Sequence, residues 1–369
     1  MPTIIEARRL RKAYGEAIAV RDVSFSVNEG EFLSLLGASG SGKTTLLRMI
    51  AGLEQPSAGQ VLYGGEDITG VPAARRNMRM VFQDFALFPN LTVRDNLAFG
   101  LRLRINRGRF SAQEIAARVG RYLETVQLSA HADKLPHQLS GGQKQRVSLA
   151  RALVTDPPVV LFDEPLGSLD ANMRKAMQIE LKRLHRDLRK TFIYVTHDQE
   201  EAMGLSDRVA VMQDGQLLQL ASPEAIYAQP NSVAVAKFFG AANVLTGVAE
   251  RSADAVALRL PGGERIWLGP KAGVDAAAAA RLTVMIRAEH LNVAPSGGGS
   301  AGALPARVTE RLFLGDKVRY ELEMPGGELR LTALTGVSRG QFDVGAAVEV
   351  FADPSAICLI PDTTPAGAP

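Results

Sequence analysis

The first two thirds of the chain contain three short runs in which apolar residues are almost unbroken. These runs cover residues 31–37, 158–165 and 191–198. Unbroken apolar segments of this length are typical of strands that are buried on both faces of a parallel sheet. The pattern therefore predicts buried parallel strands in this part of the protein.

Between these runs, apolar residues recur at the spacing of a helix. Residues 43–52 predict a helix that ends at Gly52, and residues 111–128 predict a second helix. The second helix opens with Ser111 and Glu114, which form the pattern of a capping box. Its apolar face comprises Ile115, Val119, Leu123 and Val126. Strands that alternate with helices predict an α/β fold.

After about residue 240 the pattern changes to short alternating strands that are separated by glycine and proline. Residues 318–334 predict a hairpin around a Pro-Gly-Gly turn, and residues 258–268 contain the same turn. The tripeptides at 248–250 and 308–310 precede the two hairpins by comparable distances. We interpret this region as an imperfect duplication of a small β unit, with residues 294–305 as a flexible linker between the copies. One face of the later hairpin would carry Val318, Tyr320, Leu322 and Met324.

These two hydrophobic patterns divide the 369 residues into an α/β domain at 1–240 and a β domain at 241–369. Lys and Arg exceed Asp and Glu by 42 − 39 = 3, and charges of the two signs are interleaved along the chain. Interleaved charge favours a solvated surface over a nucleic-acid interface, so we expect no nucleic-acid partner. The single cysteine, Cys358, excludes an internal disulfide framework and favours a reducing compartment, with the side chain as small core filler.

The N-terminal segment meets charge within six residues, which does not fit the apolar core of a signal peptide. The most apolar stretch, residues 274–286, is interrupted by Asp275 and Arg281. A membrane span needs roughly 18 apolar residues without such interruptions. We therefore expect a protein that stays in the cytosol unless a partner brings it to a membrane.

A glycine-rich loop at residues 37–44 follows the first predicted strand and opens the first predicted helix. In that context, backbone N–H groups curl around a phosphate chain and the helix N-terminus adds positive potential. Lys43 would reach the β and γ phosphates, and the hydroxyl of Thr44 would bind Mg²⁺. The loop predicts a nucleotide triphosphate site.

Acidic residues end the second apolar run. Because Mg²⁺ requires carboxylate support, Asp163 is expected to hold the metal. The neighbouring Glu164 is expected to polarise the water that attacks the γ phosphate. The alternative is an acidic turn before Pro165, which the presence of Lys43 upstream disfavours.

His197 ends the third apolar run. A lone histidine is more often structural than catalytic. However, ligands of open α/β sheets gather at the carboxyl ends of the strands, where this histidine is expected to lie. We therefore assign His197 to the γ phosphate.

The string Leu-Ser-Gly-Gly-Gln at residues 139–143 is a poor helix interior and a poor strand. Together with the phosphate loop, Asp163 and Glu164, it makes the sequence resemble the ATP-binding-cassette (ABC) ATPases, whose signature motif it matches. In that family the motif of one subunit covers the γ phosphate in the other subunit's phosphate loop. The resemblance implies a homodimer that binds ATP at its interface. The residues acting across the dimer would be Ser140, Gly141, Gly142 and Gln143.

Further family elements follow in order. Tyr14 resembles the aromatic residue that stacks on adenine, and Gln83 resembles the glutamine between Mg²⁺ and the membrane partner. Residues 168–170, which include Asp170, resemble the loop that crosses to the other monomer. The metal ligands implied are Thr44, Gln83 and Asp163, and the catalytic residues are Glu164, His197, Gln83 and Lys43. The nucleotide ligands implied are Tyr14, Gly37, Ala38, Ser39, Gly40, Ser41, Gly42, Lys43, Thr44, Thr45, Ser140, Gly141, Gly142, Gln143 and Asp170.

The resemblance implies a P-loop ATPase with a mixed sheet and a helical subdomain at about 84–155. The β domain resembles the oligonucleotide-fold-like (TOBE-type) domain appended to ATPases of bacterial binding-protein-dependent importers. Such an ATPase lies peripherally on the cytoplasmic face of the inner membrane. Its partners are two integral-membrane permease subunits and a periplasmic or surface solute-binding protein. Residues 173–203 most resemble the polyamine branch, and iron(III), sulfate, thiamine and 2-aminoethylphosphonate remain open as solutes.

Residues 86–103 follow Gln83 at the expected permease contact. There, Phe85, Leu87 and Phe88 either receive a coupling helix of the permease or pack inside the helical subdomain. A cassette ATPase of DNA repair or translation would normally carry a coiled-coil insertion or a second cassette, and this chain has neither. A regulatory module without hydrolysis is disfavoured by Glu164 and His197.

Overall fold

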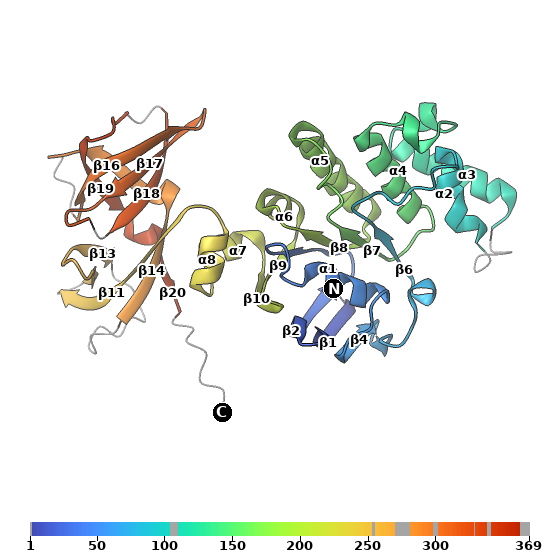
Figure 1. The fold of residues 1–369 in the computed structure, drawn as a ribbon, viewed down its shortest axis with the longest axis horizontal. Coiled ribbons are helices and arrows are strands. Elements are labelled where there is room, and N and C mark those ends of the chain that lie inside the picture. Colours follow the sequence, from blue (N-terminus) through green and yellow to red (C-terminus); the bar gives the residue numbers. More distant parts are fainter. Residues whose placement is uncertain are drawn as a thin grey trace. The chain divides into compact units, whose positions relative to one another are not determined.

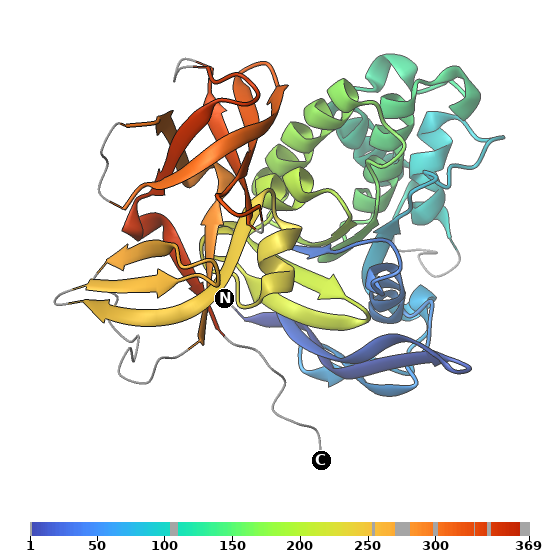
Figure 2. The same ribbon diagram turned by 60° about the vertical axis from the view of Figure 1, so that its left-hand side comes forward.

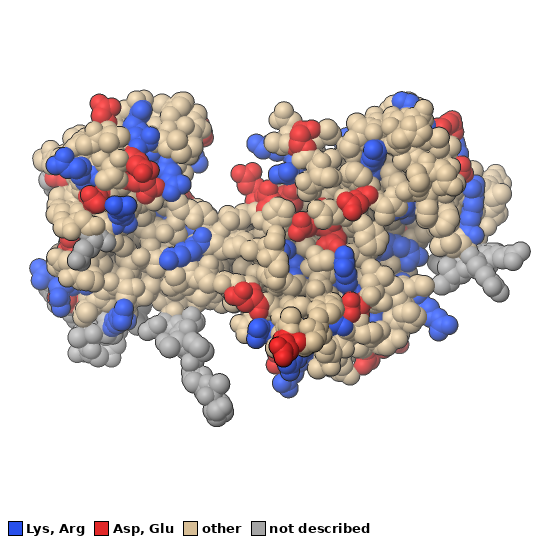
Figure 3. Space-filling view, viewed as in Figure 1, with Lys and Arg blue, Asp and Glu red and all other residues tan. Residues whose placement is uncertain are grey.

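The computed structural model describes residues 2–103, 110–252, 255–269, 281–297, 302–327, 329–337 and 341–361. Backbone contacts divide the chain into two compact units, Met1–Pro223 and Glu224–Pro369 (Figure 1). Within the described residues, no helix is both long and apolar enough to cross a membrane. Figure 3 shows cationic and anionic side chains intermixed on the face drawn.

A six-stranded sheet forms the centre of the first unit, with the strand order β10-β9-β3-β8-β7-β6. Strands β3, β6, β7, β8 and β9 run parallel, and β10 is antiparallel to β9. The three apolar runs form β3, β7 and β8, in which every residue is buried. The predicted α/β fold with a mixed sheet is therefore confirmed. The strands are β3 (Phe32–Leu36), β6 (Met78–Val81), β7 (Val159–Asp163), β8 (Thr191–Thr196), β9 (Arg208–Gln213) and β10 (Gln216–Ala221).

The two faces of this sheet are covered by different elements (Figures 1 and 2). Val159 and Leu161 of β7 pack with α1 (Lys43–Ala51) and with the antiparallel sheet β2-β1-β4-β5. Val160 and Phe162 point the opposite way and pack with helices α2 to α5. The bounds of the remaining elements are β1 (Thr3–Tyr14), β2 (Ala17–Asn28), β4 (Ala58–Tyr63), β5 (Glu66–Asp67), α2 (Val93–Arg102), α3 (Ala112–Thr125), α4 (Gly141–Leu153), α5 (Ala171–Leu188) and α6 (Gln199–Leu205).

The predicted helix boundaries are close to the observed ones. Helix α1 ends at Ala51 because Gly52 adopts the left-handed conformation, with φ 75°. Helix α3 begins with the predicted capping box, in which Ser111 and Glu114 each bond the other's backbone N–H. It stops at Thr125, three residues before the predicted end at 128, because the chain turns through Gln127, with φ 58°.

The second unit repeats one order of elements. Three antiparallel strands, a fourth strand, a 3₁₀ turn and a fifth strand occur twice, as β11 to β15 and as β16 to β20. The sheet orders are β13-β12-β11-β14-β20 and β15-β19-β16-β17-β18. The fifth strands are therefore exchanged, since β20 completes the first sheet and β15 completes the second. The buried face predicted for Val318, Tyr320, Leu322 and Met324 is confirmed.

The bounds of these strands are β11 (Ala242–Ser252), β12 (Ala255–Arg259), β13 (Arg265–Gly269), β14 (Arg281–Arg287), β15 (Leu291–Pro295), β16 (Leu304–Phe313), β17 (Lys317–Glu323), β18 (Arg330–Gly336), β19 (Ala347–Ala352) and β20 (Ile357–Ile360). The predicted linker at 294–305 is shorter than expected because its two ends lie in β15 and β16. Residues 298–301 lie outside the described residues.

Two short helices, α7 (Pro223–Ala228) and α8 (Val233–Phe238), connect the cassette to β11. Ala236 of α8 packs against Met285 and Ile360, and the guanidinium of Arg287 donates to the Ala236 carbonyl at 3.0 Å. The two helices are thus held by the second unit. The domain boundary near residue 240 stays a prediction, and the contacts divide the chain 17 residues earlier, since 240 − 223 = 17.

Candidate functional site

The loop at residues 37–44 has a backbone that only glycine permits at two positions. A Cβ on Gly37 would lie 2.2 Å from the Met212 carbonyl oxygen, and a Cβ on Gly42 would lie 2.3 Å from the Ala19 carbonyl oxygen. Gly42 also has φ 94° and precedes α1 without any side-chain cap. The first N–H groups of α1 therefore remain available to an anion.

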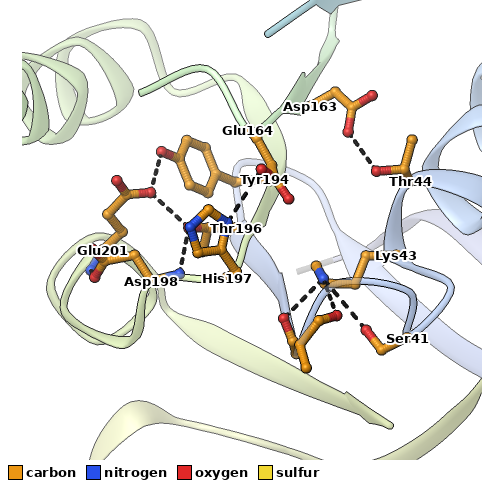
Figure 4. Close-up of polar contacts among 12 residues, drawn as sticks. Ser41, Lys43, Thr44, Asp163, Glu164, Tyr194, Thr196, His197, Asp198 and Glu201 are labelled. Carbon is orange, nitrogen blue, oxygen red and sulfur yellow. Dashed lines mark hydrogen bonds and ion pairs between the residues drawn. The ribbon is translucent and has the colours of Figure 1, made fainter. Parts of the chain in front are cut away.

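Lys43 is buried inside this loop, where 4% of its surface is exposed. Its ammonium donates to the Gly37 and Ala38 carbonyls, both at 2.8 Å, and approaches Ser41 Oγ at 3.4 Å (Figure 4). Burial lowers the pKa of Lys43, while the charges of Glu164 and Asp163 act in the opposite direction. The cation thus lies beneath the cradle of N–H groups, bonded to backbone oxygens that a phosphate can replace.

Thr44 and Asp163 meet at the carboxyl end of β7. The Thr44 hydroxyl donates to Asp163 Oδ1 at 2.8 Å (Figure 4). The Arg48 guanidinium lies 4.0 Å from Asp163 Oδ2. Burial raises the pKa of Asp163, and the Thr44 hydrogen bond opposes that shift. A hydroxyl and a carboxylate oxygen beside a phosphate cradle match the hard oxygen ligands that Mg²⁺ prefers.

Glu164 and His197 come from adjacent strands and face each other. His197 Nδ1 lies 3.2 Å from Glu164 Oε2 (Figure 4). The backbone N–H of Glu164 donates to the Val195 carbonyl at 3.1 Å. Glu164 has φ 45°, a conformation that costs about 1–3 kcal/mol and is found at functional sites. The carboxylates of Glu164 and Asp163 thus have different partners, His197 and Thr44.

Gln83 reaches the same region from the segment after β6. A Cβ built on Gly167 would lie 3.6 Å from Gln83 Nε2 and 4.0 Å from Glu164 Oε2. The structure therefore brings together the predicted residues Lys43, Thr44, Gln83, Asp163, Glu164 and His197. Ala38, Ser39 and Gly40 are exposed at the rim of the loop, and Thr45 lies in the first turn of α1.

A buried hydrogen-bond network next to His197 was not predicted from the sequence. The side chains of Tyr194 and Thr196 donate to Glu201 Oε2 at 2.8 and 2.7 Å (Figure 4). Glu201 is 4% exposed, and burial raises its pKa. The backbone N–H of Asp198 donates to Thr196 Oγ1 at 2.9 Å. The signal in the sequence is a glutamate four residues after the histidine, on the first turn of α6.

The Leu-Ser-Gly-Gly-Gln string begins a helix. Ser140 caps α4, its hydroxyl accepting from the Gln143 N–H at 3.3 Å while Gln143 Oε1 accepts from the Ser140 N–H at 3.0 Å. Gln143 Nε2 lies 3.0 Å from His131 Nε2. The two glycines occupy the first turn of α4, where a Cβ on Gly142 would lie 2.9 Å from Met173 Sδ.

Two further predicted ligands, Asp170 and Tyr14, have other contacts in the described residues. Asp170 caps α5 by accepting from the Met173 N–H at 2.9 Å. Tyr14 is 50% exposed, with the Lys12 ammonium 4.9 Å from its ring centre. The motif at 139–143 opens α4, which packs on the face of the sheet opposite to α1.

Comparison with known proteins supports this reading of the geometry. A family model described as "ABC transporter" matches residues 20–167, and one described as "TOBE domain" matches residues 284–360. A spermidine/putrescine import ATP-binding protein PotA of Rubrobacter xylanophilus is 45% identical over 327 residues, covering 88% of this chain and 85% of that protein. A PotA of Pseudomonas aeruginosa is 42% identical over 355 residues, covering 94% and 96%.

Other relatives differ in the solute they name. The sulfate/thiosulfate import ATP-binding protein CysA 1 of Chromobacterium violaceum is 46% identical over 319 residues and covers 86% of both chains. Among solved structures, the ABC transporter cassette MJ0796, a dimer, is 34% identical with TM-score 0.54 and covers 60% of this chain and 99% of that one. A post-hydrolysis dimer of MJ0796 bound to ADP and Pi is 33% identical with TM-score 0.53, with the same coverage.

The chain belongs to the ABC transporter family, as an ATP-binding subunit. The second family match and the full-length relatives specify it further, as the ATPase subunit of an ABC importer with a C-terminal TOBE domain.

Proposed function

We propose that this protein binds Mg-ATP, closes as a homodimer around two nucleotides and hydrolyses them to drive polyamine import through a partner permease. The observation that carries the proposal is the division of the site between the two faces of one sheet. Lys43, Thr44 and Glu164 surround the phosphate loop, whereas Ser140 and Gln143 start a helix on the opposite face.

Each predicted residue has a task that its position supports. The N–H groups of the loop and Lys43 bind the β and γ phosphates. Thr44, Gln83 and Asp163 are the proposed ligands of Mg²⁺, which, when bound, neutralises charge on the phosphate oxygens. Glu164 accepts a proton from the attacking water, and His197, 3.2 Å from it, donates to the γ phosphate.

The dimer is supported by chemistry at the start of α4. Helix N-termini bind anions, and the glycines at 141 and 142 allow a phosphate to approach the backbone closely. The capping box already fixes Ser140 and Gln143 before any nucleotide arrives. A second copy of the chain therefore presents an ordered surface to the γ phosphate, and its loop at Asp170 also crosses to this subunit. Tyr14 stacks on the adenine ring.

Permease binding is proposed at a groove of the first unit. The groove encloses about 490 Å³ and is lined by Leu53, Met80, Phe82, Gly100 and Leu103, among others. Leu53 and Leu103 are 51% and 43% exposed, and burial of such side chains stabilises association. An apolar helix of a permease is the proposed occupant. With this occupant, the proposed location of the protein is the cytoplasmic face of the inner membrane.

Two of the three aromatic and aliphatic residues predicted near this contact face inward instead. Phe85 and Leu87 pack against the core formed by α2 to α5. Phe88 stacks on Phe99 with ring centres 4.2 Å apart. Of the two alternatives given for these residues, packing inside the helical subdomain is therefore the one proposed for Phe85 and Leu87. Phe99, which is 37% exposed, is available to a partner in their place.

The solute is proposed from the relatives, because the ATPase does not contact it. Proteins named for spermidine and putrescine import are 42–46% identical to this chain. Sulfate is the second candidate, since a sulfate/thiosulfate relative is 46% identical. Iron(III), thiamine and 2-aminoethylphosphonate remain open as further solutes.

The test is ATP hydrolysis by the chain assembled with its permease and solute-binding protein in lipid vesicles, measured with spermidine, putrescine, sulfate or thiosulfate outside. Stimulation by a polyamine with uptake into the vesicle would support the proposal in full. Stimulation by sulfate would keep the transport mechanism and overturn the solute. Hydrolysis that is indifferent to the permease would overturn the coupling itself. Glu164→Gln should abolish turnover in every arm while ATP binding persists.

A further inference from the structure

Arg174 joins two loops that the proposed mechanism treats separately. It lies in the first turn of α5, four residues after Asp170, and its Nη2 donates to the Leu169 carbonyl at 3.1 Å. Its Nη1 lies 3.5 Å from Asp198 Oδ2, and its Nε lies 3.8 Å from Glu201 Oε1. One guanidinium thus contacts the loop at 168–170 and the segment that follows His197.

The carboxylate that Arg174 faces is the end of a short chain of hydrogen bonds. Glu201 accepts from Thr196 at 2.7 Å, and Thr196 accepts from the Asp198 N–H at 2.9 Å. Thr196 and Asp198 flank His197 in the sequence, so both of its neighbours are held by this chain of bonds (Figure 4). Because Glu201 is 4% exposed, its carboxylate depends on these donors and on the nearby cation.

We propose that Arg174 is a positioning residue that transmits the state of the loop at 168–170 to His197 of the same subunit. The inference rests on the proposed function, in which this loop meets the partner subunit. When a partner moves the Leu169 carbonyl, the guanidinium shifts with it. The planar guanidinium then moves Asp198 and Glu201, and Glu201 moves Thr196 and the His197 backbone. Hydrolysis at one site therefore depends on closure of the dimer.

The first test compares Arg174→Ala with Arg174→Lys and with Arg183→Ala. Arg183 is on the same helix, with a side chain 70% exposed and an ion pair to Asp187. Arg174→Ala is expected to lower kcat about 10- to 100-fold while the KM for ATP stays within twofold, because the histidine is misplaced but the phosphate loop is intact. Lys, a point charge, should restore part of the rate, and Arg183→Ala should behave as wild type.

Stability separates this role from a structural one. If Arg174 only supported folding, the Arg174→Ala variant would have a lower melting temperature. Its kcat, expressed per molecule that still binds nucleotide, would then equal the wild-type kcat. Thr196→Val provides a second variant of similar size, which removes the hydroxyl between Glu201 and Asp198. It should lower kcat in the same way. A wild-type kcat in both variants would overturn the proposal.

Mixed dimers decide the direction of the effect. One subunit carries Glu164→Gln, so that a single site turns over, and Arg174→Ala is placed either in the active subunit or in the Glu164→Gln subunit. Single-turnover hydrolysis should be slow only when Arg174→Ala is in the active subunit. Slow turnover in the opposite arrangement would overturn the proposal, because the loop would then act on the partner's site alone. Absence of turnover in wild-type dimers would instead overturn the proposed function.

Discussion

Two helices of the cassette begin with glycine-rich segments, and they begin in opposite ways. Helix α1 starts after Gly42, which has φ 94° and no side-chain cap. Helix α4 starts after Ser140, whose hydroxyl and backbone N–H exchange hydrogen bonds with Gln143. The first N–H groups of α1 are thus left for a ligand, whereas side chains at the start of α4 accept from two backbone N–H groups, those of Ser140 and Gln143.

The glycines of the two segments also serve different ends. At Gly37 and Gly42 an added Cβ would meet backbone carbonyl oxygens at 2.2 and 2.3 Å, so the fold itself requires glycine. At Gly142 the obstacle is the flexible side chain of Met173, and at Gly141 the nearest atom is 3.4 Å away. The fold therefore constrains Gly141 less than Gly37 or Gly42, and the proposed approach of a phosphate supplies a reason for glycine there. The start of α1 has no side-chain cap and leaves N–H groups for a phosphate. The start of α4 has a side-chain capping box without any ligand.

The largest effect is expected from Lys43→Ala. The ammonium is buried under the phosphate loop, so its removal takes away the cation that faces the developing charge on the γ phosphate. The value of kcat/KM for ATP should fall by about 10³-fold, in the range seen for a lost transition-state donor. Steady-state hydrolysis by the transporter measures it, with Lys237→Ala, an exposed lysine of the second unit, as the control. Activity within tenfold of wild type would contradict the role given to α1.

The next effect contrasts Gly42→Ala with Gly141→Ala. The first variant is strained by its positive φ and by the Ala19 carbonyl, and should lose about 1–3 kcal/mol of unfolding free energy together with ATP binding. The second has ordinary contacts and a helical position, so its unfolding free energy should stay equal or rise by up to about 1 kcal/mol.

Urea unfolding and equilibrium binding of a fluorescent ATP analogue distinguish these two glycine variants. Gly141→Ala should bind nucleotide normally and weaken only the ATP-dependent dimer, because the proposed function puts the start of α4 against the partner's phosphate and a methyl group would hinder that approach. Equal loss of stability in the two variants would show that both segments use glycine for the same reason.

A smaller effect is expected from Ser140→Ala, with Ser111→Ala as the matched control. Both serines cap helices by the same reciprocal bonds, in α4 and in α3. Each variant should lose about 1 kcal/mol of unfolding free energy. Only Ser140→Ala should also weaken the ATP-dependent dimer, by roughly tenfold or more, since a hydrogen bond to a charged group contributes about 1.5–3 kcal/mol.

The dimer is best measured in the Glu164→Gln background by analytical ultracentrifugation with ATP. If Ser111→Ala weakened the dimer as much as Ser140→Ala does, the effect would be one of helix stability. Ser140 would then have no direct contact with the partner's nucleotide.

The sequence predicted the features of the fold that depend on residues close together in the chain. The apolar runs of β7 and β8, the Gly52 stop and the Ser111 capping box depend on neighbours within a few residues, and all were confirmed. The residues around the phosphate loop were also predicted, because parallel strands end at a common edge. The grouping of Lys43, Asp163 and Glu164 required no distance information beyond that rule.

The features that the sequence could not predict depend on distant pairings. β15 and β20 have similar apolar patterns, so nothing local shows that each completes the sheet of the other repeat. The contact of Met173 with Gly142, and of Arg174 with Glu201, joins elements that are adjacent only after folding. From the sequence alone, Glu201 would be predicted to be an exposed helix residue. Its burial depends on the hydrogen-bond donors Tyr194 and Thr196.

The smallest expected effect concerns the backbone N–H groups themselves. ATP added to the protein below its dimerisation concentration should slow amide hydrogen exchange at residues 39–45 by about tenfold, because phosphate accepts from the free donors of α1. Exchange at residues 140–143 should stay unchanged in the monomer, since these residues start a helix on the opposite face of the sheet from α1 and the capping box already satisfies the N–H groups of Ser140 and Gln143. In the Glu164→Gln dimer, exchange should slow in both segments. Slowing at 140–143 in the monomer would place both helix starts around one nucleotide, which the opposite faces of the sheet forbid.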